Sequence, residues 1–314
     1  MMRIWRRLVA FTLVSAVNGQ VSMMDRAAHV RNNPAELDNL WAKAKIVHFS
    51  AGRLAIADGA SQLRFLNAAQ IDELIESEGF KTGERYFLGL DQKENAPYFA
   101  WNSPHADSEK EEAPAGYATL REIGGELDEV QMEIALHTVA LSNWHNTHPH
   151  CARCGATTSV ALGGAVRTCD KDKSEHYPRT DCAVIVLVRD SQDRILLGRQ
   201  AIWPEGRFSC FAGFLEPGET FEQCVQREVY EESGLKVREI NYLGSQPWPF
   251  PASVMISFEA ITDLPDSARP DGEEIVDIKW LTRAELRAEV SDRTLSLPPS
   301  MSVSRKMIDR WLFS

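Results

Sequence analysis

The segment from Gly213 to Leu235 constrains the fold most, because it collects three glutamates within little more than one helical turn. It reads G-F-L-E-P-G-E-T-F-E-Q-C-V-Q-R-E-V-Y-E-E-S-G-L. Thr220, followed three residues later by Gln223, is typical of a helix start, and Gly234 is typical of a helix end. The residues between them are therefore predicted to form a helix.

The glutamates of this helix, Glu228, Glu231 and Glu232, share one face because positions i, i+3 and i+4 are neighbours. Three unpaired carboxylates at this spacing repel one another, whereas a divalent cation with oxygen ligands would turn the repulsion into binding. A solvated acidic helix end is the alternative. It is disfavoured because acids are unfavourable at a helix C-terminus and because Phe221 and Cys224 lie on the same side. The acids therefore predict a cation site.

The whole run resembles the Nudix box, G-x5-E-x7-R-E-U-x-E-E-x-G-U with U aliphatic, and meets every defined position. So many residues at fixed spacing make the motif far more specific than a lone glycine pattern. The resemblance implies an α/β/α sandwich hydrolase that cleaves a nucleoside diphosphate linked to another group and uses Mg²⁺ or Mn²⁺. The matching positions are Gly213, Glu219, Arg227, Glu228, Val229, Glu231, Glu232, Gly234 and Leu235.

Length, charge and cysteine usage narrow the class of protein. With 314 residues the chain exceeds a usual single core, so more than one domain is expected. A net charge of -11 argues against a protein that holds nucleic acid mainly through its phosphates. The six cysteines show no disulfide framework. We therefore expect a protein of a reducing compartment, the cytoplasm, with no membrane partner.

Residues 1–22 combine a charged start with a short apolar run, as signal peptides do. The apolar run is too short to span a membrane, and only a weak small-residue cleavage site follows it. Met23 and Met24 directly precede a stretch that is typical of the start of a soluble protein. We expect an upstream start-codon artefact or a disordered extension, and export stays the alternative.

The rest of the chain is predicted to divide into four parts. Residues 23–125 form a small N-terminal α/β domain, 126–147 a connecting helix, 148–178 a zinc-ribbon-like module and 179–314 the Nudix domain. The fold class is thus α/β, with the Nudix sandwich preceded by the ribbon and the small domain. In the N-terminal domain, strands are predicted at 45–49, 54–57, 85–90 and 98–101, and a helix at 68–78.

The ribbon prediction depends on Cys151-x-x-Cys154 and, after fourteen residues, Cys169. A zinc ribbon presents two pairs of tetrahedral ligands, and its fourth cysteine would fall at Asp172. Two interpretations stay open. Either zinc is held by three thiolates and completed by Asp172 or by a histidine, or the ribbon has lost its metal and is held by packing. The candidate histidines are His148, His150 and His176.

A proline-rich run, Ser245 to Ser253, reads S-Q-P-W-P-F-P-A-S and begins ten residues after the box. Its three prolines and two aromatics make a rigid platform that could hold planar rings with little ordering cost, and packing alone is the alternative. Such a run after a Nudix box and a zinc ribbon is similar to the NADH pyrophosphatase family, also called NAD-capped RNA hydrolases. The resemblance is close from Leu127 to the C-terminus and loose before it.

This resemblance implies hydrolysis of NAD(H) to AMP and nicotinamide mononucleotide, with NAD-capped RNA as a further substrate. It implies metal ligands at Glu228, Glu231, Glu232, Glu274 and the Ala212 carbonyl. It implies substrate contacts at Tyr177, Phe214, Gln246, Pro247, Trp248, Pro249, Phe250, Pro251, Ala252, Ser253 and Ser304. The family usually has alanine at the position of Ser304, where a backbone group contacts substrate.

Glu232 and Glu274 are the candidates for the base that takes a proton from the attacking water. Arg227 is expected to brace the loop through an ion pair rather than to touch substrate. Two other functions stay open: a Nudix hydrolase of ADP-ribose or a diadenosine compound, and a nucleotide sensor that does not hydrolyse. The resemblance also suggests a homodimer.

Overall fold

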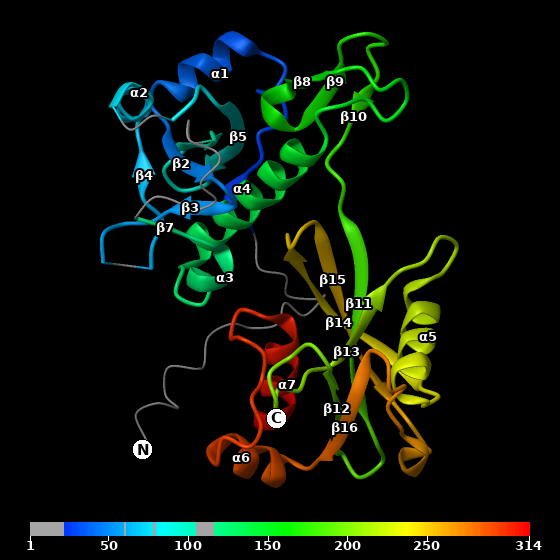
Figure 1. Ribbon diagram of the computed structural model, residues 1–314. Helices are drawn as coiled ribbons and strands as arrows, with labels where there is room; N and C mark the ends of the chain where they lie inside the picture. Colours follow the sequence, from blue (N-terminus) through cyan, green and yellow to red (C-terminus); the bar gives the residue numbers. More distant parts are fainter. Residues whose placement is uncertain (1–21, 60, 78–79, 105–115) are drawn as a thin grey trace. The chain divides into compact units, whose positions relative to one another are not determined.

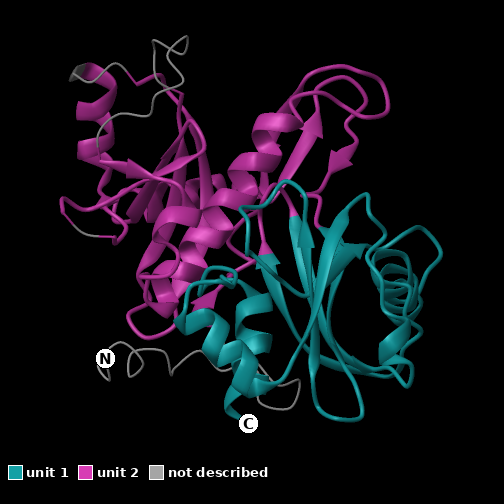
Figure 2. Cartoon of the chain, turned by 60° about the horizontal axis from the view of Figure 1, so that its bottom comes forward, with its two compact units in different colours: residues 1–20, 181–247, 253–314 teal, residues 21–180, 248–252 magenta. Residues whose placement is uncertain are grey.

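The computed structural model describes residues 22–59, 61–77, 80–104 and 116–314 of the chain. The residues form two compact units (Figures 1 and 2). Unit 1 contains residues 181–247 and 253–314, and unit 2 contains residues 21–180 and 248–252. The prediction for residues 1–22 concerns a segment of which only residue 22 is among the described residues.

The helices and strands follow one another along the chain as labelled in Figure 1. The α-helices are α1 (Pro34–Trp41), α2 (Ala68–Ser77), α3 (Leu120–Ile123), α4 (Glu129–Thr147), α5 (Phe221–Ser233), α6 (Arg283–Ser291) and α7 (Val303–Phe313), with 3-10 helices η2 (Leu162–Gly164) and η3 (Pro265–Ser267). The strands are β1 (Met24–Asp25), β2 (Lys45–Ser50), β3 (Arg53–Ala55), β4 (Phe65–Leu66), β5 (Glu84–Asp91), β6 (Pro97–Asn102), β7 (Tyr117–Ala118), β8 (Thr158–Ala161), β9 (Val166–Cys169), β10 (Glu175–His176), β11 (Asp181–Arg189), β12 (Ile195–Gln200), β13 (Phe211–Phe214), β14 (Arg238–Trp248), β15 (Ser253–Ile261) and β16 (Ile275–Leu281).

Unit 2 is built on a seven-stranded sheet in the order β1-β5-β6-β2-β3-β7, with β4 beside β2. Strand residues alternate between two faces, and β5 shows which helix covers each face. Phe87 lies in a core cluster with residues of α1 and α2. Its neighbour Tyr86 instead stacks on His145 of α4, with ring centroids 4.2 Å apart. The predicted strands are present as β2, β3, β5 and β6 and the predicted helices as α2 and α4, although β3 ends at Ala55 and α4 begins at Glu129.

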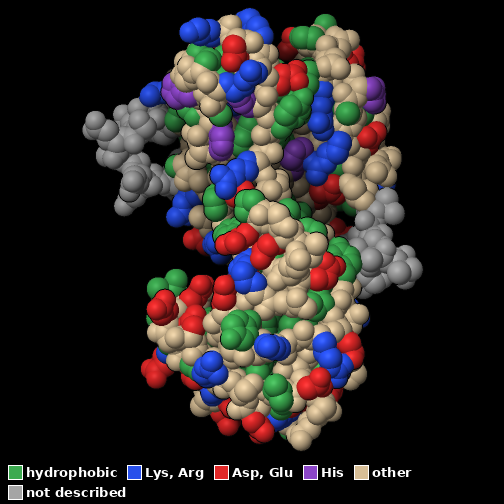
Figure 3. Space-filling model, turned by 90° about the vertical axis from the view of Figure 1, so that its right-hand side faces the viewer, with side chains coloured by type: hydrophobic (Ala, Val, Ile, Leu, Met, Phe, Trp, Pro, Cys, Tyr) green, Lys and Arg blue, Asp and Glu red, His purple; other side chains and the backbone are tan. Residues whose placement is uncertain are grey.

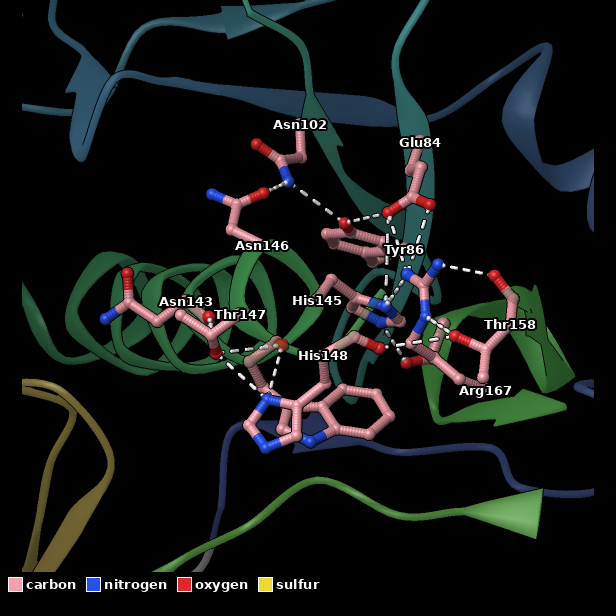
Figure 4. Close-up of polar contacts among 12 residues, drawn as sticks. Glu84, Tyr86, Asn102, Asn143, His145, Asn146, Thr147, His148, Thr158 and Arg167 are labelled. Atoms are coloured by element: carbon pink, nitrogen blue, oxygen red, sulfur yellow. Dashed lines mark hydrogen bonds and ion pairs between the residues drawn. The ribbon is translucent and has the colours of Figure 1, made fainter. Parts of the chain in front are cut away.

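The ribbon is a three-stranded antiparallel sheet, β10-β9-β8, that is tied to the larger sheet by polar side chains (Figure 4). Arg167 of β9 is 5% exposed and donates to His145 Nδ1 at 2.9 Å and to Glu84 Oε1 at 3.2 Å. Tyr86 Oη donates to Glu84 Oε2 at 2.6 Å. Because buried polar groups need such partners, this network fixes the ribbon on the sheet and on α4.

Unit 1 is a six-stranded mixed sheet, β14-β15-β11-β12-β16, with β13 beside β11 and with β11 and β15 parallel. Val184, Val186 and Val188 of β11 belong to the core that α5 covers. Ile185 and Leu187, which alternate with them, belong to the core that α6 and α7 cover. Helices thus pack on both faces (Figure 1), and the predicted α/β/α sandwich is confirmed.

Within the part of the chain that the structure describes, no helix combines the length and the apolar character that crossing a bilayer requires.

Candidate functional site

Helix α5, which carries the box glutamates, begins and ends where the sequence predicts. Thr220 Oγ1 accepts a hydrogen bond from the Gln223 amide at 3.2 Å, and Gln223 Oε1 accepts one from the Thr220 amide at 2.8 Å. Gly234 closes the helix in the left-handed region with a φ of 69°, where a residue without a Cβ is unstrained. The three glutamates therefore lie in the last two turns of the helix.

Arg227 connects the loop before α5 with the acids of the helix. Its guanidinium donates to both oxygens of Glu219, at 2.7 and 2.8 Å, and to the Phe214 carbonyl at 2.9 Å. It also donates to Glu228 at 2.7 Å and to Glu231 at 3.1 Å. The predicted ion pair between Arg227 and the loop is confirmed. The expectation of three unpaired carboxylates is wrong for Glu228 and Glu231, because Arg227 reaches both.

Glu232 is in a different environment. It is 4% exposed, and its Oε2 has no hydrogen-bond partner among the described residues. Burial first, and then the negative charges of Glu274 and Glu228, raise the pKa of Glu232 to about 9. The Ala212 backbone amide opposes this rise. A charged carboxylate without a partner is costly in such a place, so a cation beside Glu232 would remove both the desolvation cost and the repulsion.

Gly213 leaves the space that the Glu228 carboxylate occupies. The residue lies in β13, opposite Val184 of the central strand β11. A Cβ on Gly213 would lie 1.9, 2.0 and 2.2 Å from the three carboxylate atoms of Glu228, which is far inside van der Waals contact. The box needs glycine here because the carboxylate rests directly on the strand.

Glu274 directly precedes β16, the edge strand of the sheet of unit 1. Its exposed carboxylate accepts a hydrogen bond from Gln200 Nε2 at 2.7 Å. After burial, the charge of Glu274 is the largest cause of the raised pKa of Glu232. Burial also raises the pKa of Glu228, and Glu274 adds to it. The structure thus brings Glu274 to the box acids and adds Gln200, which lies outside any motif.

The donors available at this site are carboxylates, which are the ligands that a hard divalent cation prefers. All eight histidines precede residue 181, and those visible in Figure 3 accordingly belong to unit 2. The acids of unit 1 that influence one another, Glu228, Glu232 and Glu274, offer oxygen ligands, which Mg²⁺ and Mn²⁺ prefer. The buried Glu232 Oε2, which has no hydrogen-bond partner among the described residues, is the donor left open to a cation.

Gln246, one of the expected substrate contacts, holds the start of α7. Its Nε2 donates to the Met301 carbonyl at 2.8 Å, and its Oε1 accepts from the Val303 amide at 2.7 Å. Ser302, at the N-cap position, makes no side-chain cap of its own. Gln246 therefore satisfies one of the amides that a helix start leaves open.

Ser304, another expected substrate contact, is 2% exposed and faces the loop before β13. Its hydroxyl accepts from the Cys210 amide at 3.1 Å and lies 2.8 Å from the Ser209 hydroxyl. Alanine at this position would lack both contacts. The serine thus ties α7 to the chain two residues before Ala212.

Two further expected substrate contacts are exposed aromatic residues. Phe214 is 58% exposed, and its carbonyl is held by Arg227. Tyr177 in unit 2 is 64% exposed, and its hydroxyl donates to Glu175 at 2.6 Å. Exposed rings of this kind can stack on planar ligands.

The proline-rich run is divided between the units. Pro247 is the last residue of one stretch of unit 1 and Ser253 begins the next, whereas 248–252, which contains Pro249, Pro251 and Ala252, groups with unit 2. The rings of Trp248 and Phe250 meet edge to face, with centroids 4.9 Å apart and planes at 71°. We call residues 248–252 the aromatic platform.

The ribbon brings three thiols and one carboxylate together. The donor atoms of Cys151, Cys154, Cys169 and Asp172 all lie within 4.8 Å of one another. The Cys154 and Cys169 sulfurs are 3.5 Å apart, and Cys151 Sγ is 3.9 Å from Asp172 Oδ2. Zinc–sulfur bonds of about 2.3 Å in a tetrahedron place ligands about 3.8 Å apart. The donor set therefore fits zinc.

Ser174 orients the carboxylate of this cluster. Its amide and its hydroxyl donate to Asp172 Oδ1 at 2.9 and 2.6 Å, and these bonds hold the pKa of Asp172 well below its usual range. Among the described residues, the potential metal cluster includes Asp172 but not His148, His150 or His176. The structure therefore supplies Asp172, of the four candidates, as the partner of the thiols.

Three family models match consecutive parts of the chain. They are the NADH pyrophosphatase-like rudimentary NUDIX domain at residues 43–144, the NADH pyrophosphatase zinc ribbon domain at 146–177 and the NUDIX domain at 179–298. Together they follow the order that the sequence predicts.

Curated relatives match over part of their length. A protein of Mycobacterium bovis named NAD-capped RNA hydrolase NudC is 43% identical over 206 residues, which are 63% of this chain and 66% of that protein. The human protein named NAD-capped RNA hydrolase NUDT12 is 35% identical over 199 residues, 60% of this chain and 43% of that protein. The crystal structure of a NUDIX hydrolase from Nitrosomonas europaea matches 47% of this chain and 96% of its own, with 24% identity and a TM-score of 0.37.

Proposed function

Because this chain belongs to the NADH pyrophosphatase family of the Nudix superfamily, we propose that it hydrolyses the pyrophosphate bond of NAD(H) to AMP and nicotinamide mononucleotide. NAD caps on RNA are included as substrates, since the relatives described above carry the name NAD-capped RNA hydrolase. The observation that carries the proposal is the buried, unpartnered carboxylate oxygen of Glu232 beside Glu228 and Glu274.

We assign the cation to Glu228, Glu231 and Glu232 of α5, to Glu274 and to the Ala212 carbonyl. When bound, Mg²⁺ or Mn²⁺ neutralises charge on the two phosphates and lowers the pKa of a bound water. Glu232 suits the role of ligand, because a carboxyl with a pKa near 9 is protonated at neutral pH until a cation displaces the proton. Glu274 suits the role of base, because it is exposed and Gln200 holds only its Oε1.

Substrate recognition is assigned to the aromatic and proline-rich residues. In unit 1 we propose that Phe214 stacks on a base or on the nicotinamide ring. In unit 2 we propose the same kind of contact for Tyr177 and for the aromatic platform. Gln246 and Ser304 act through α7, because their side chains are engaged with residues 301–303 and 209–210.

Product analysis tests this function. The full chain, with Mg²⁺ or Mn²⁺, is incubated with NADH, NAD⁺, ADP-ribose and diadenosine compounds at equal concentration, and the products are separated by chromatography. We expect AMP and nicotinamide mononucleotide in equal amounts from both dinucleotides. Faster cleavage of ADP-ribose would favour a different Nudix substrate, and no cleavage of any compound would favour a nucleotide sensor. NAD-capped RNA in a parallel reaction tests cap removal.

We further propose that the ribbon holds one zinc ion through Cys151, Cys154, Cys169 and Asp172. Asp172→Ala removes one of four ligands, so we expect zinc in the purified variant to fall well below one ion per chain and its release to a chelator to accelerate about tenfold or more. Asp170→Ala is the matched control, because the Asp170 carboxylate is bound by Thr157 and Ser159 instead. Equal zinc content in both variants would contradict the assignment.

The cytoplasm and a homodimer complete the proposal. A reducing compartment is supported by the ribbon thiols, which are free cysteines in the structure. The homodimer is supported by the family resemblance and by the prevalence of two-fold pairs. Light scattering on the protein as it elutes from a size-exclusion column should then give a mass twice the chain mass of 35.2 kDa.

A further inference from the structure

The aromatic platform is anchored to helices of the N-terminal part of the chain. Its five residues form part of unit 2, together with α3 and α4. Pro249 and Pro251 have no amide hydrogen, so their backbone can be held only through carbonyl oxygens. The Phe250 amide is already used within the platform, where it donates to the Trp248 carbonyl at 2.7 Å. The carbonyl oxygens of Pro249 and Pro251 can therefore be bound only by donors from other residues.

Asn143 of α4 supplies these donors. Its side-chain Nδ2 donates to the Pro249 carbonyl and to the Pro251 carbonyl, each at 3.1 Å. One amide group thus fixes the backbone on both sides of Phe250. Figure 4 shows Asn143 on α4, where its own carbonyl accepts a hydrogen bond from Thr147 Oγ1 at 2.8 Å.

Arg121 of α3 holds the rings. Its guanidinium carbon lies 4.0 Å from the Phe250 ring centroid and 5.4 Å from the Trp248 ring centroid. A cation over an aromatic face is attracted by the electron-rich face of the neutral ring. The short helix that carries Arg121 begins with a reciprocal cap between Thr119 and Glu122. One planar cation on an ordered turn therefore contacts both rings of the platform.

We propose that Arg121 and Asn143 are positioning residues for the aromatic platform. Through them, unit 2 sets the affinity of the enzyme for the rings of its dinucleotide substrate. The inference rests on the proposed function for the identity of the substrate. Its physical basis is preorganisation, because rings that are already fixed need not be ordered when substrate binds. This preorganisation gives unit 2, which does not contain the Nudix box, a role in substrate binding.

Substitutions at Asn143 and Arg121 test the hydrogen-bond donor and the positive charge separately from the size of the side chain. Asn143→Asp keeps the size of the side chain and replaces the donor by a carboxylate that faces two carbonyl oxygens. Arg121→Met keeps much of the length and removes the cation, and Arg121→Lys restores a cation without the planar group. Arg85→Ala is the matched control, because Arg85 lies 4.3 Å over Trp41 in the same unit but belongs to a different pair.

Steady-state kinetics give the first readout. For Asn143→Asp and Arg121→Met we expect KM for NADH to rise roughly tenfold with kcat changed less than about threefold, the loss that one cation–ring contact or its equivalent predicts. Arg121→Lys should recover part of the KM. Arg85→Ala should leave both constants unchanged, which would show that the loss of a cation–ring pair elsewhere in unit 2 does not by itself raise KM.

Fluorine NMR of protein labelled with 5-fluorotryptophan gives a second readout that needs no activity. Trp248→Phe identifies the Trp248 resonance. We expect Arg121→Met and Asn143→Asp to shift or broaden that resonance, and Arg85→Ala to leave it in place. An unmoved Trp248 resonance in both platform variants would overturn the inference.

The outcomes separate this inference from the proposed function. If the unmodified protein hydrolyses none of the dinucleotides, the proposed function fails, and the NMR experiment still tests the positioning of the platform. If the unmodified protein is active and both variants keep its KM, the function stands and the role of Arg121 and Asn143 in binding is refuted. A loss confined to kcat would also refute it.

Discussion

We expect Glu232→Gln to fold normally and to lose at least about a hundredfold in turnover, the loss typical of removing a group that acts on a proton or holds the catalytic cation. Glutamine keeps the size of the buried side chain and cannot carry its charge. The measurement is kcat for NADH with saturating Mg²⁺. Glu222→Gln in the first turn of the same helix is the control, because Glu222 is exposed. Unimpaired turnover in the Glu232→Gln variant would refute the assignment of Glu232 to the catalytic site.

The same variant should change how stability depends on pH. In the protein without added divalent cation, Glu232 has a pKa of about 9 when folded and about 4.3 when unfolded. Between these values the folded state binds more protons, so stability falls as pH rises through the interval. Glu232→Gln lacks this group, and its melting temperature should fall less between about pH 5 and pH 8. Parallel curves for the two proteins would contradict the raised pKa.

Gly213→Ala should have the second large effect, on cation binding rather than on folding. The new Cβ would occupy the place of the Glu228 carboxylate, at 1.9 to 2.2 Å from its atoms. Because that carboxylate is the end of a flexible side chain, it can move aside at little cost in stability. We expect Mn²⁺ affinity, measured by calorimetry, to fall about 10- to 100-fold with little change in melting temperature.

A double-mutant cycle shows whether the clash is the cause. In a Glu228→Ala background the carboxylate is absent, so adding Gly213→Ala should weaken Mn²⁺ binding no further. If Gly213→Ala weakens binding equally in both backgrounds, the effect comes from the backbone of β13 rather than from displacement of Glu228.

The local features of the site could be predicted because their causes lie within a few residues. The start of α5 follows from Thr220 and Gln223, and its end follows from Gly234. The ion pair between Arg227 and Glu219 joins two defined positions of the same motif, eight residues apart. The sandwich follows from a motif that specifies a whole family. In each case neighbouring positions carry the information.

The contacts that the sequence did not reveal join distant parts of the chain. Gln200 reaches Glu274 across 74 positions, and Asn143 reaches Pro249 across 106. Neither residue belongs to a motif, and an amide in a strand or helix is usually a surface group. Such partners depend on how the sheets and helices pack. A single sequence contains no local signal for them.

Gln246 can meet its two partners only late in the synthesis of the protein, because Met301 and Val303 lie 55 and 57 positions further along the chain. α7 also supplies Met307 and Ile308 to the core on one face of the Nudix sheet. A nascent chain that has been synthesised as far as Ser253 contains all the glutamates of the box but not the helix that covers this face. Much of the preceding unit can fold during translation, whereas the face of the Nudix sheet opposite α5 is covered only after α7 has left the ribosome.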